Sequence, residues 1–583
     1  MARYRTPVAS SVTAAALRVL PIPVAVAVAT PSAAATVFTV TQLADTADGV
    51  CDAQCTLRDA VAAAEAAPAG DTIRFAASLA GGQITLVLGQ LEFTSAVRID
   101  GATREVTING GATSRIFDVQ TAGRVELIGL RLTQGAGAGG GAIRNAGQLS
   151  VIGCLVEDNT SDGARDDDGG GIKNTESGVL TVVNSIFRGN SSGFSDGGSL
   201  GGGGISSAGE LTVRASRITD NYSGGSGSGL SSTGTATIED TVIDNNFQVV
   251  DGGGLANFGT MTLRHSTVRD NEAYDLGGGI LNGGFTGVGT LIVESSTISG
   301  NVSDFYLGGG IYNGGGSTLE LRNSTVTDNY ASFFGETGGG LYNSGEATAR
   351  NTLLAGNRAN GLNQFTADCG GNPVTSEGGN VFGTGTGCAP GSSDRTVDPF
   401  EVATAVVLPL ADYGGLTPTN ALRWAGSNPA LDIGGSCPAV DQRGLPAPLD
   451  GPDAGTVASC DAGSVEAGAP VNARVNVAAQ DEIALVPFGG DNTLTVTIRA
   501  RNVSGKPQTY DLWTTTTAPD GSVVATQVQR DITFEPEQPR QRAITAQLPG
   551  AAGLYRIDAF VGDYDSGVVV GSDALPVSKN GQA

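Results

Sequence analysis

The sequence predicts an all-β protein: a right-handed parallel β-helix followed by an immunoglobulin-like β-sandwich. Three observations predict this fold class. Glycine contributes 89 of the 583 residues, while 40% of residues are apolar and only 16% are charged. A Gly-Gly-Gly motif followed by Ile or Leu recurs every 25–33 residues between 139 and 357. From residue 470 the repeat stops, and longer alternating strands separated by Gly, Pro and Asp replace it.

Composition narrows the classes of function. Acidic residues outnumber basic ones by 58 to 33, giving a formal net charge of −25, and only Lys173, Lys506 and Lys579 are lysines. A nucleic-acid binder is therefore excluded, because such proteins carry a basic face. The single histidine, His265, excludes sites built from several histidines, including most zinc hydrolases.

The N-terminus, residues 1–35, has the pattern of a secretory signal peptide. Arg3 and Arg5 precede a short apolar run at Val19–Ala29, and the small residues Ala33–Ala35 offer a cleavage site. No later run reaches ~18 apolar residues, so we expect no transmembrane segment. Seven cysteines in an exported chain suggest three disulfides, and sequence proximity favours these pairs: Cys51–Cys55, Cys369–Cys388 and Cys437–Cys460. The seventh, Cys154, is expected to be buried and inert.

Each repeat unit holds three predicted short strands separated by turns. Asn follows the Ile or Leu by two residues in most units, as in Asn145, Asn174 and Asn257. The unit closes on another Asn, and the series is Asn159, Asn190, Asn221, Asn245, Asn271, Asn301, Asn329 and Asn357. One unit cannot bury its apolar side alone, but stacked units can, and this predicts a β-helix over 76–400. Glycine supplies the turns and stacked Asn bonds from coil to coil, so both columns are interpreted as structural.

Three motifs resemble known families of bacterial β-helix proteins. Cys51–Val61 resembles the CSLREA-type motif of secreted β-helix proteins, which implies a capping region over 36–75 with a short helix at Leu57–Ala67. Gly-Gly-Gly-Ile and Phe187–Asn190 are similar to the repeats of polymorphic outer membrane proteins. A series over 401–469 resembles the choice-of-anchor Q region, and its segments are Leu410–Thr419, Ser427–Gly434, Asp441–Gly444 and Asp461–Glu466. The resemblances imply a secreted or cell-surface bacterial protein.

The sandwich is predicted over 470–583, where strands such as Leu494–Ile498 and Tyr555–Val561 lie between turn residues. Trp513 is interpreted as a packing residue there. Such a domain acts as a spacer or a binding module, and its fold does not decide between them.

The first candidate site is the outward position between the Ile or Leu and the Asn of each unit. It places Arg144 beside Lys173 on adjacent coils, ~5 Å apart. An ion-paired surface patch involving Asp166, Asp167 and Asp168 is one interpretation. The other is a polysaccharide lyase, in which a cation neutralises a uronate carboxylate and Lys173 or Arg144 removes the α proton. In that case the three aspartates would bind calcium, the one cofactor considered.

The second candidate site is the loop that ends each unit, where acids and aromatics recur. Stacked coils would gather them into an acidic, aromatic ridge for sugar binding. The residues expected to bind there, with two tyrosines of the outward column, are Asp251, Tyr274, Asp275, Asp304, Tyr306, Tyr312, Glu336 and Tyr342. Paired carboxylates also carry out glycoside hydrolysis, so that activity remains an alternative.

His265 falls in a mostly polar column whose other members are read as Asn184, Ala215, Glu239, Ser295, Asn323 and Asn351, and we expect it to be structural. Three hypotheses remain for the whole chain. It is a monomeric glycan or cell-envelope binding protein, a polysaccharide lyase or glycoside hydrolase, or a passive structural exoprotein.

Overall fold

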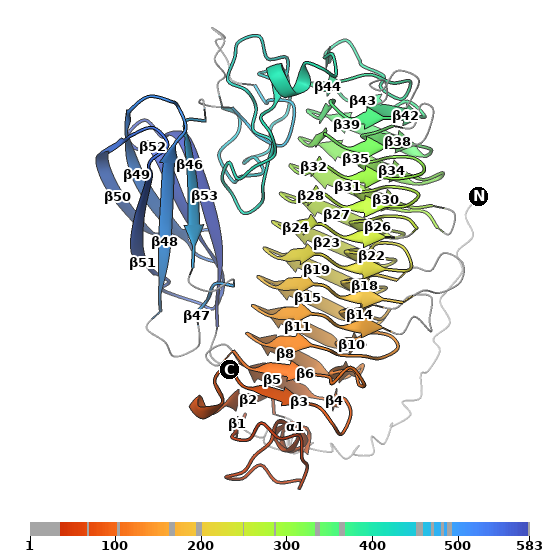
Figure 1. Ribbon diagram of the computed structural model, residues 1–583, viewed down its shortest axis with the longest axis vertical. Coiled ribbons are helices and arrows are strands. Elements are labelled where there is room, and N and C mark those ends of the chain that lie inside the picture. The colour runs from red at the N-terminus through yellow and green to blue at the C-terminus, as the bar shows by residue number, and fades with distance from the viewer. Residues whose placement is uncertain are drawn as a thin grey trace, which may run out of the picture.

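The computed structural model confirms a parallel β-helix with a second β domain beside it (Figure 1). It describes residues 35–66, 69–101, 105–161, 169–193, 201–248, 250–284, 287–332, 338–360, 368–449, 459–467, 471–479, 483–486 and 492–580. In that part of the chain the only α-helix is α1 (Leu57–Ala66), and the last residue of the predicted helix, Ala67, lies outside the described residues. No helix there is long and apolar enough to cross a membrane.

The described part of the β-helix consists of four parallel sheets, three of which begin in its first coils. Sheet 1 consists of β1 (Val37–Val40), β2 (Asp71–Phe75), β5 (Ala96–Asp100), β8 (Arg124–Ile128), β11 (Gln148–Ile152), β15 (Val179–Val183), β19 (Glu210–Arg214), β23 (Thr235–Glu239), β27 (Thr260–Arg264), β31 (Thr290–Glu294), β35 (Thr318–Arg322), β39 (Glu346–Arg350) and β43 (Thr375–Ser376). Sheet 2 consists of β3 (Gln83–Thr85), β6 (Thr107–Asn109), β9 (Arg131–Thr133), β12 (Leu155–Glu157), β16 (Ile186–Arg188), β20 (Arg217–Thr219), β24 (Val242–Asp244), β28 (Thr267–Arg269), β32 (Thr297–Ser299), β36 (Thr325–Thr327), β40 (Leu353–Leu354), β44 (Val381–Phe382) and β45 (Arg395–Thr396).

Sheet 3 carries the Ile or Leu that follows the glycines. It consists of β4 (Leu91–Phe93), β7 (Phe117–Val119), β10 (Ile143–Asn145), β14 (Ile172–Asn174), β18 (Ile205–Ser207), β22 (Leu230–Ser232), β26 (Leu255–Asn257), β30 (Ile280–Asn282), β34 (Ile311–Asn313), β38 (Leu341–Asn343) and β42 (Cys369–Gly371). Sheet 4, which was not predicted, consists of β13 (Thr160–Ser161), β17 (Ser191–Ser192), β21 (Tyr222–Ser223), β25 (Phe247–Gln248), β29 (Glu272–Ala273), β33 (Val302–Ser303), β37 (Tyr330–Ala331) and β41 (Arg358–Ala359). Its two-residue strands are too short to show alternation in the sequence.

The core is one apolar column per sheet face, filled by the same position of successive coils. Ile280, Leu291 and Ile298 from three strands of one coil are fully buried together, and the same holds along the helix. Because coils rise by ~4.8 Å, each of these side chains packs between its equivalents above and below. The repeat in the sequence therefore becomes a continuous core.

A buried asparagine ladder links the coils at the turn before sheet 4. Asn271 donates from Nδ2 to Asn301 Oδ1 at 3.0 Å and to the Ile243 carbonyl at 3.0 Å. Its Oδ1 accepts from Asn246 Nδ2 at 2.9 Å. The predicted Asn245 is therefore wrong as the closing residue of its unit: Asn246 takes the ladder position, while Asn245 adopts a positive φ of 54°. The ladder ends on Asp368, whose Oδ1 accepts from Asn357 Nδ2 at 3.0 Å.

The N-terminal end of the β-helix is covered by α1. Arg58 on this helix donates from Nε to Asp45 Oδ1 at 2.7 Å. Asp59 Oδ2 accepts from the Thr56 hydroxyl at 2.6 Å and closes the start of the helix. Leu57, Ala60 and Ala64 face the core and are buried. The open sheet edges at this end are thereby protected.

All three predicted disulfides form: Cys51–Cys55, Cys369–Cys388 and Cys437–Cys460. Cys154 is free and buried. Its backbone N–H donates to Ser185 Oγ at 3.1 Å, so it heads a column of hydroxyl residues that links neighbouring coils. This agrees with the inert role predicted for it.

The cap, described over residues 401–449 and 459–467, packs on the outside of the β-helix, and Gln442 makes several polar contacts there. Gln442 Nε2 donates to Ser266 O at 3.1 Å and to Thr267 Oγ1 at 2.9 Å, and Gln442 Oε1 accepts from Thr297 Oγ1 at 2.6 Å. Arg443 forms an ion pair with Asp441 at 2.6 Å. The residues that resemble the choice-of-anchor Q region therefore act here as structural contacts between cap and coil.

The C-terminal domain has two antiparallel sheets. One contains β46 (Ala473–Ala478), β48 (Thr493–Asn502) and β51 (Pro539–Gln547). The other contains β47 (Leu485–Val486), β53 (Val568–Lys579), β52 (Gly553–Asp563), β49 (Gln508–Thr517) and β50 (Val523–Phe534), with β47 parallel to β53. Trp513 is 7% exposed and stacks on Phe560, in agreement with its predicted packing role. The domain contacts the β-helix through Asn184 Nδ2, which donates to Ala484 O at 2.7 Å.

Candidate functional site

The outward column of sheet 3 brings Arg144 and Lys173 together, as predicted. The two residues are register partners on β10 and β14. Arg144 Nη1 forms an ion pair with Asp118 Oδ1 at 3.1 Å, from the coil before it. Lys173 is only 5% exposed, and its Nζ donates to Ser206 Oγ at 3.3 Å. Both cations therefore have partners within the protein, and Lys173 is largely covered.

Asp166, Asp167 and Asp168 lie outside the described residues, so their predicted calcium site stays a prediction. Within the described ranges, no group of three His, Cys, Asp or Glu side chains is placed to hold a metal ion.

The acid beside Arg144 was not found by sequence reasoning. Asp118 is 6% exposed. Its Oδ2 also forms an ion pair with Arg115 Nη1 at 3.5 Å and accepts a hydrogen bond from Gln120 Nε2 at 3.2 Å. Asp118 belongs to a coil without the Gly-Gly-Gly motif. The repeat pattern therefore could not align it with Arg144. The sequence signal that could have located Asp118 is the apolar–polar–apolar pattern of Phe117–Val119, which indicates a strand with Asp118 on its outward face.

The acidic, aromatic ridge forms where sheet 4 turns into sheet 3. Tyr274, Phe305 and Tyr306 are 44%, 51% and 46% exposed. The rings of Tyr274 and Phe305 stack with centroids 4.2 Å apart and an interplanar angle of 28°. The loops that carry them are themselves in register, because Phe305 N donates to Tyr274 O at 2.8 Å. This stacking makes a partly exposed apolar stack that spans two coils.

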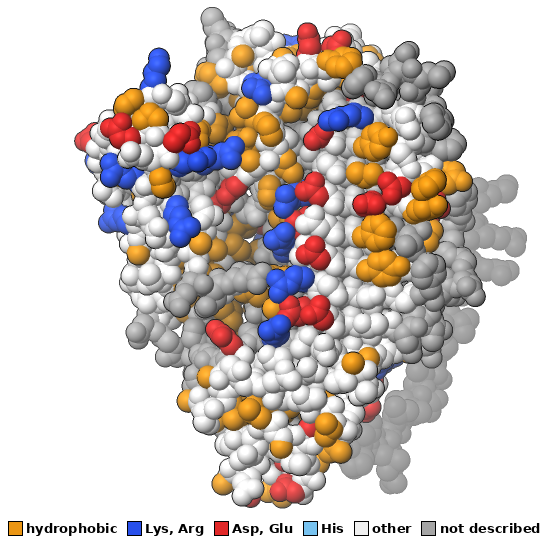
Figure 2. Space-filling view, viewed as in Figure 1, with side chains coloured by type: hydrophobic (Ala, Val, Ile, Leu, Met, Phe, Trp, Pro, Cys, Tyr) orange, Lys and Arg blue, Asp and Glu red, His pale blue; other side chains and the backbone are white. Residues whose placement is uncertain are grey.

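Sheet 3 continues the apolar surface beside this ridge. Tyr312 and Tyr342 stack almost in parallel, with centroids 5.9 Å apart and an interplanar angle of 2°. Tyr312 packs in an outward cluster with Ala256 and Leu281, and Phe258 and Tyr342 lie against that cluster. Figure 2 shows hydrophobic side chains gathered with acidic ones on the right, level with β26 to β38 of Figure 1. Phe258 was not predicted, because it follows the Asn rather than preceding it.

The carboxyl groups of the ridge are poorly solvated. Burial raises the pKa of Asp251 to about 6, although its Oδ1 accepts from Leu276 N at 3.0 Å. Burial likewise raises the pKa of Asp275. Burial, a side-chain hydrogen bond with Asp304 and the charge of Asp304 raise the pKa of Glu272. Glu336 lies outside the described residues.

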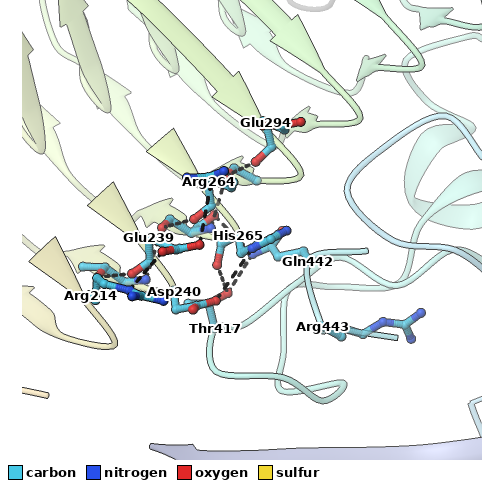
Figure 3. Close-up of polar contacts among 12 residues, drawn as sticks. Arg214, Glu239, Asp240, Arg264, His265, Glu294, Thr417, Gln442 and Arg443 are labelled. Carbon is cyan, nitrogen blue, oxygen red and sulfur yellow. Dashed lines mark hydrogen bonds and ion pairs between the residues drawn. The ribbon is translucent and has the colours of Figure 1, made fainter. Parts of the chain in front are cut away.

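His265 lies in a structural turn, as Figure 3 shows. Its Nδ1 is 3.9 Å from Asp240 Oδ1, and its carbonyl accepts from Thr417 Oγ1 at 2.9 Å. The predicted neighbour Glu239 is wrong, because Glu239 is in register with Arg264 and Asp240 stands opposite His265. Both His265 and Asp240 have positive φ values, 48° and 51°, as does the equivalent residue of most neighbouring coils.

A ladder of alternating charge, also missed from the sequence, runs beside that turn on sheet 1. Arg214 Nε lies 3.0 Å from Glu239 Oε2, and Arg264 Nε lies 3.7 Å from Glu239 Oε1. Figure 2 shows the alternating red and blue side chains down the middle of the molecule. The sequence signal for this ladder is the charged residue that ends the sheet 1 strand of successive units. Exposed pairs of this kind contribute ~0–1 kcal/mol each, and we interpret them as structural.

Comparison with known proteins gives no family for this chain. No protein-family model and no curated protein matches it. Among solved structures, the CARDB domain of a Pyrococcus furiosus protein is 16% identical over 18% of this chain and 94% of the domain, with a TM-score of 0.15. A crystal structure of that domain in complex with di-metal ions is 15% identical over 19% of this chain and 86% of that chain, with a TM-score of 0.14.

A third solved structure is the Pseudomonas fluorescens alkylpurine DNA glycosylase AlkC bound to DNA containing an abasic site analog. It is 13% identical, covers 19% of this chain and 32% of that chain, and has a TM-score of 0.15. Function has to be argued from the residues of the site itself.

Proposed function

We propose that this protein is an extracellular, monomeric β-helix protein of a bacterial surface, which binds glycans through the ridge formed by Tyr274, Phe305 and Tyr306 and the carboxyl groups beside them. The observation that carries the proposal is the exposed stack of Tyr274 on Phe305. Exposed aromatic rings present the flat apolar face that a sugar ring covers, and neighbouring carboxyl groups accept hydrogen bonds from its hydroxyls.

Three disulfides support an extracellular location, since disulfides persist in oxidising compartments. The signal-like segment 1–35 and the CSLREA-like motif point the same way. The exported chain would then begin near Thr36.

Hydrolysis is the weaker of the two uses of the ridge. The carboxyl groups of glycosidases are ~5 Å apart or more, which leaves room for the sugar or for a water molecule. Glu272 and Asp304 instead lie within hydrogen-bonding reach of each other. Lyase chemistry has less support, because Lys173 is covered and Arg144 already pairs with Asp118.

A panel of immobilised polysaccharides, including chitin, peptidoglycan and polygalacturonate, tests the proposal with the full chain. We expect saturable binding to at least one of them. Tyr274→Ala together with Phe305→Ala removes both stacked faces and should weaken the Kd roughly tenfold or more, equivalent to about 1.4 kcal/mol. Phe400→Ala is the matched control, because Phe400 is a 63% exposed aromatic residue in the cap.

Two outcomes would overturn the proposal. One is the absence of binding to every polysaccharide, and the other is unchanged binding by the double variant. Release of unsaturated uronate from polygalacturonate, lost in Lys173→Ala, would support the lyase instead.

A further inference from the structure

The outer side of the C-terminal sandwich has an open seam between its two sheets. β50 is the terminal strand of the five-stranded sheet, and β51 is the terminal strand of the three-stranded sheet. Each therefore has a sheet neighbour on one side only: β49 for β50 and β48 for β51. Most residues of both strands are exposed. Long exposed edges of this kind are templates for pairing with another strand.

The seam is hollow. A cavity of about 580 Å³ lies between the two strands, with core residues at its floor and strand residues along its rim. The floor is Ile498, Leu512 and Phe534, all of which belong to the apolar core of the domain. On the rim, Val528 is 38% exposed. Apolar side chains that entered the seam would therefore reach the core directly.

The rim is basic in an acidic protein. Arg540 and Arg542 line the cavity from β51, and they bridge it by donating to Thr533 O at 3.2 Å and to Gln529 Oε1. Among the described residues, no carboxylate lies within ion-pair distance of either guanidinium, while the chain as a whole carries a net charge of −25. Figure 2 shows basic side chains gathered on this domain, at the upper left. An acidic ligand complements this rim.

We propose that the seam between β50 and β51 binds an extended peptide segment of a partner protein that carries apolar and acidic side chains on the same face. The incoming strand extends one of the two sheets through main-chain hydrogen bonds. Arg540 and Arg542 lie on the same face of β51 as the buried Ile544. The side chains of the incoming strand that face this way therefore include apolar ones, which enter toward Ile498 and Leu512, and acidic ones, which pair with the two arginines. A glycan fits the seam less well, because Phe534, the aromatic residue of the floor, is 1% exposed and offers no free face.

The probe is a capped octapeptide in which every second residue is valine or glutamate in turn and the residues between them are threonine, labelled for fluorescence anisotropy and used below the concentration at which it self-associates. We expect saturable binding to the full chain and no binding of the valine–lysine counterpart. Arg540→Glu with Arg542→Glu should weaken the valine–glutamate peptide at least tenfold and create binding of the valine–lysine peptide. Arg499→Glu is the control, because Arg499 lies between the buried Ile498 and Ala500 on β48 and faces away from the seam.

Two further ligands separate strand pairing from simple attraction of anions. A valine–glutamate peptide with N-methylated amides keeps its charge but cannot pair with a strand edge, so it should not bind. Equal binding of this peptide, or competition by oligogalacturonate, would overturn the proposal in favour of an anion or glycan site. Absence of peptide binding would overturn it as well, and so would unchanged binding after charge reversal in a variant with unchanged circular dichroism. The glycan-binding ridge is not involved, so the two proposals fail independently.

Discussion

Cys154 occupies the position that serine holds in the following coils. Its side chain is fully buried, and burial raises the pKa of its thiol to about 12. The thiolate is the reactive form of cysteine, and here it is absent at physiological pH. In this column the backbone N–H of one coil donates to the side-chain hydroxyl of the next coil. A serine at position 154 would therefore fit the column as the other serines do.

We therefore expect no reaction of the folded protein with a thiol reagent, and one reactive thiol per chain after unfolding under non-reducing conditions. Mass spectrometry after alkylation measures this. Cys154→Ser should fold normally and give no alkylation in either state. Labelling of the native protein would contradict the burial of Cys154.

Within single elements, the sequence predicted the coil well but not its local register. The Gly-Gly-Gly-Ile spacing fixed where each sheet 3 strand lies, because glycine is needed where the backbones of adjacent coils approach closely. A Cβ on Gly278 would lie 2.2 Å from Val302 O. Asn245 and Asn246 both satisfied the period, however, and only the hydrogen-bond geometry distinguishes them. The same one-residue ambiguity placed Glu239 beside His265.

The site was predicted in part for a related reason. Repetition placed Tyr274, Phe305 and Tyr306 on one surface, because coils of similar length stack in register. Repetition could not show that Asp118 reaches Arg144 or that Lys173 is covered, since burial depends on neighbours outside the repeat. The seam of the sandwich is also invisible in sequence, because it depends on which strands end each sheet.

The cap segment contains two buried acids whose ionisation opposes its folding. Burial raises the pKa of Asp461 to about 7, and burial and the neighbouring Asp461 charge raise the pKa of Glu466 to about 8. Asp441, Asp432 and one cation, Arg443, face them. Since both pKa values are raised by folding, the folded cap holds protons that the unfolded chain releases. Its stability is therefore greatest below the ordinary carboxyl pKa and falls as the pH rises through 7 to 8.

We expect the urea midpoint of the cap to fall between pH 6 and pH 9. Trp424 packs against the cap core and reports on it in a Trp513→Phe background. Glu466→Gln keeps the shape of the side chain and removes its titration, so this variant should lose much of the pH dependence. A midpoint that rises with pH in the parent would contradict the assignment.

At the scale of the whole molecule, the β-helix, cap and sandwich contact one another in pairs. Arg556 Nη2 of the sandwich donates to Arg443 O of the cap at 2.6 Å. Leu485 of β47 lies against Gly153 of the coil, where a Cβ would be 3.0 Å from Leu485 Cδ1. The sandwich thus lies alongside the coil rather than extending beyond its end (Figure 1).

Leu485→Asp places a charge in this apolar contact and should detach the sandwich from the coil. Small-angle X-ray scattering should then show a larger maximum dimension, with unchanged circular dichroism. Val523→Asp is the control, because Val523 is 60% exposed on β50. Equal dimensions for parent and variant would show that the contact through β47 does not hold the domains together.

The asparagine ladder also bears on how such a molecule changes length. Asn159, the first rung, only donates a side-chain amide hydrogen bond to the next rung, and its Oδ1 accepts from the backbone N–H of Gly135. Each rung from Asn190 to Asn357 both donates and accepts such a bond, whereas Asp368, at the last position, only accepts. A unit duplicated or deleted in the middle therefore leaves no donor unmatched, provided that the acidic terminator stays last. The length of the coil can therefore change by whole repeat units. The distance between α1 and the cap can change in this way without substitutions at either end.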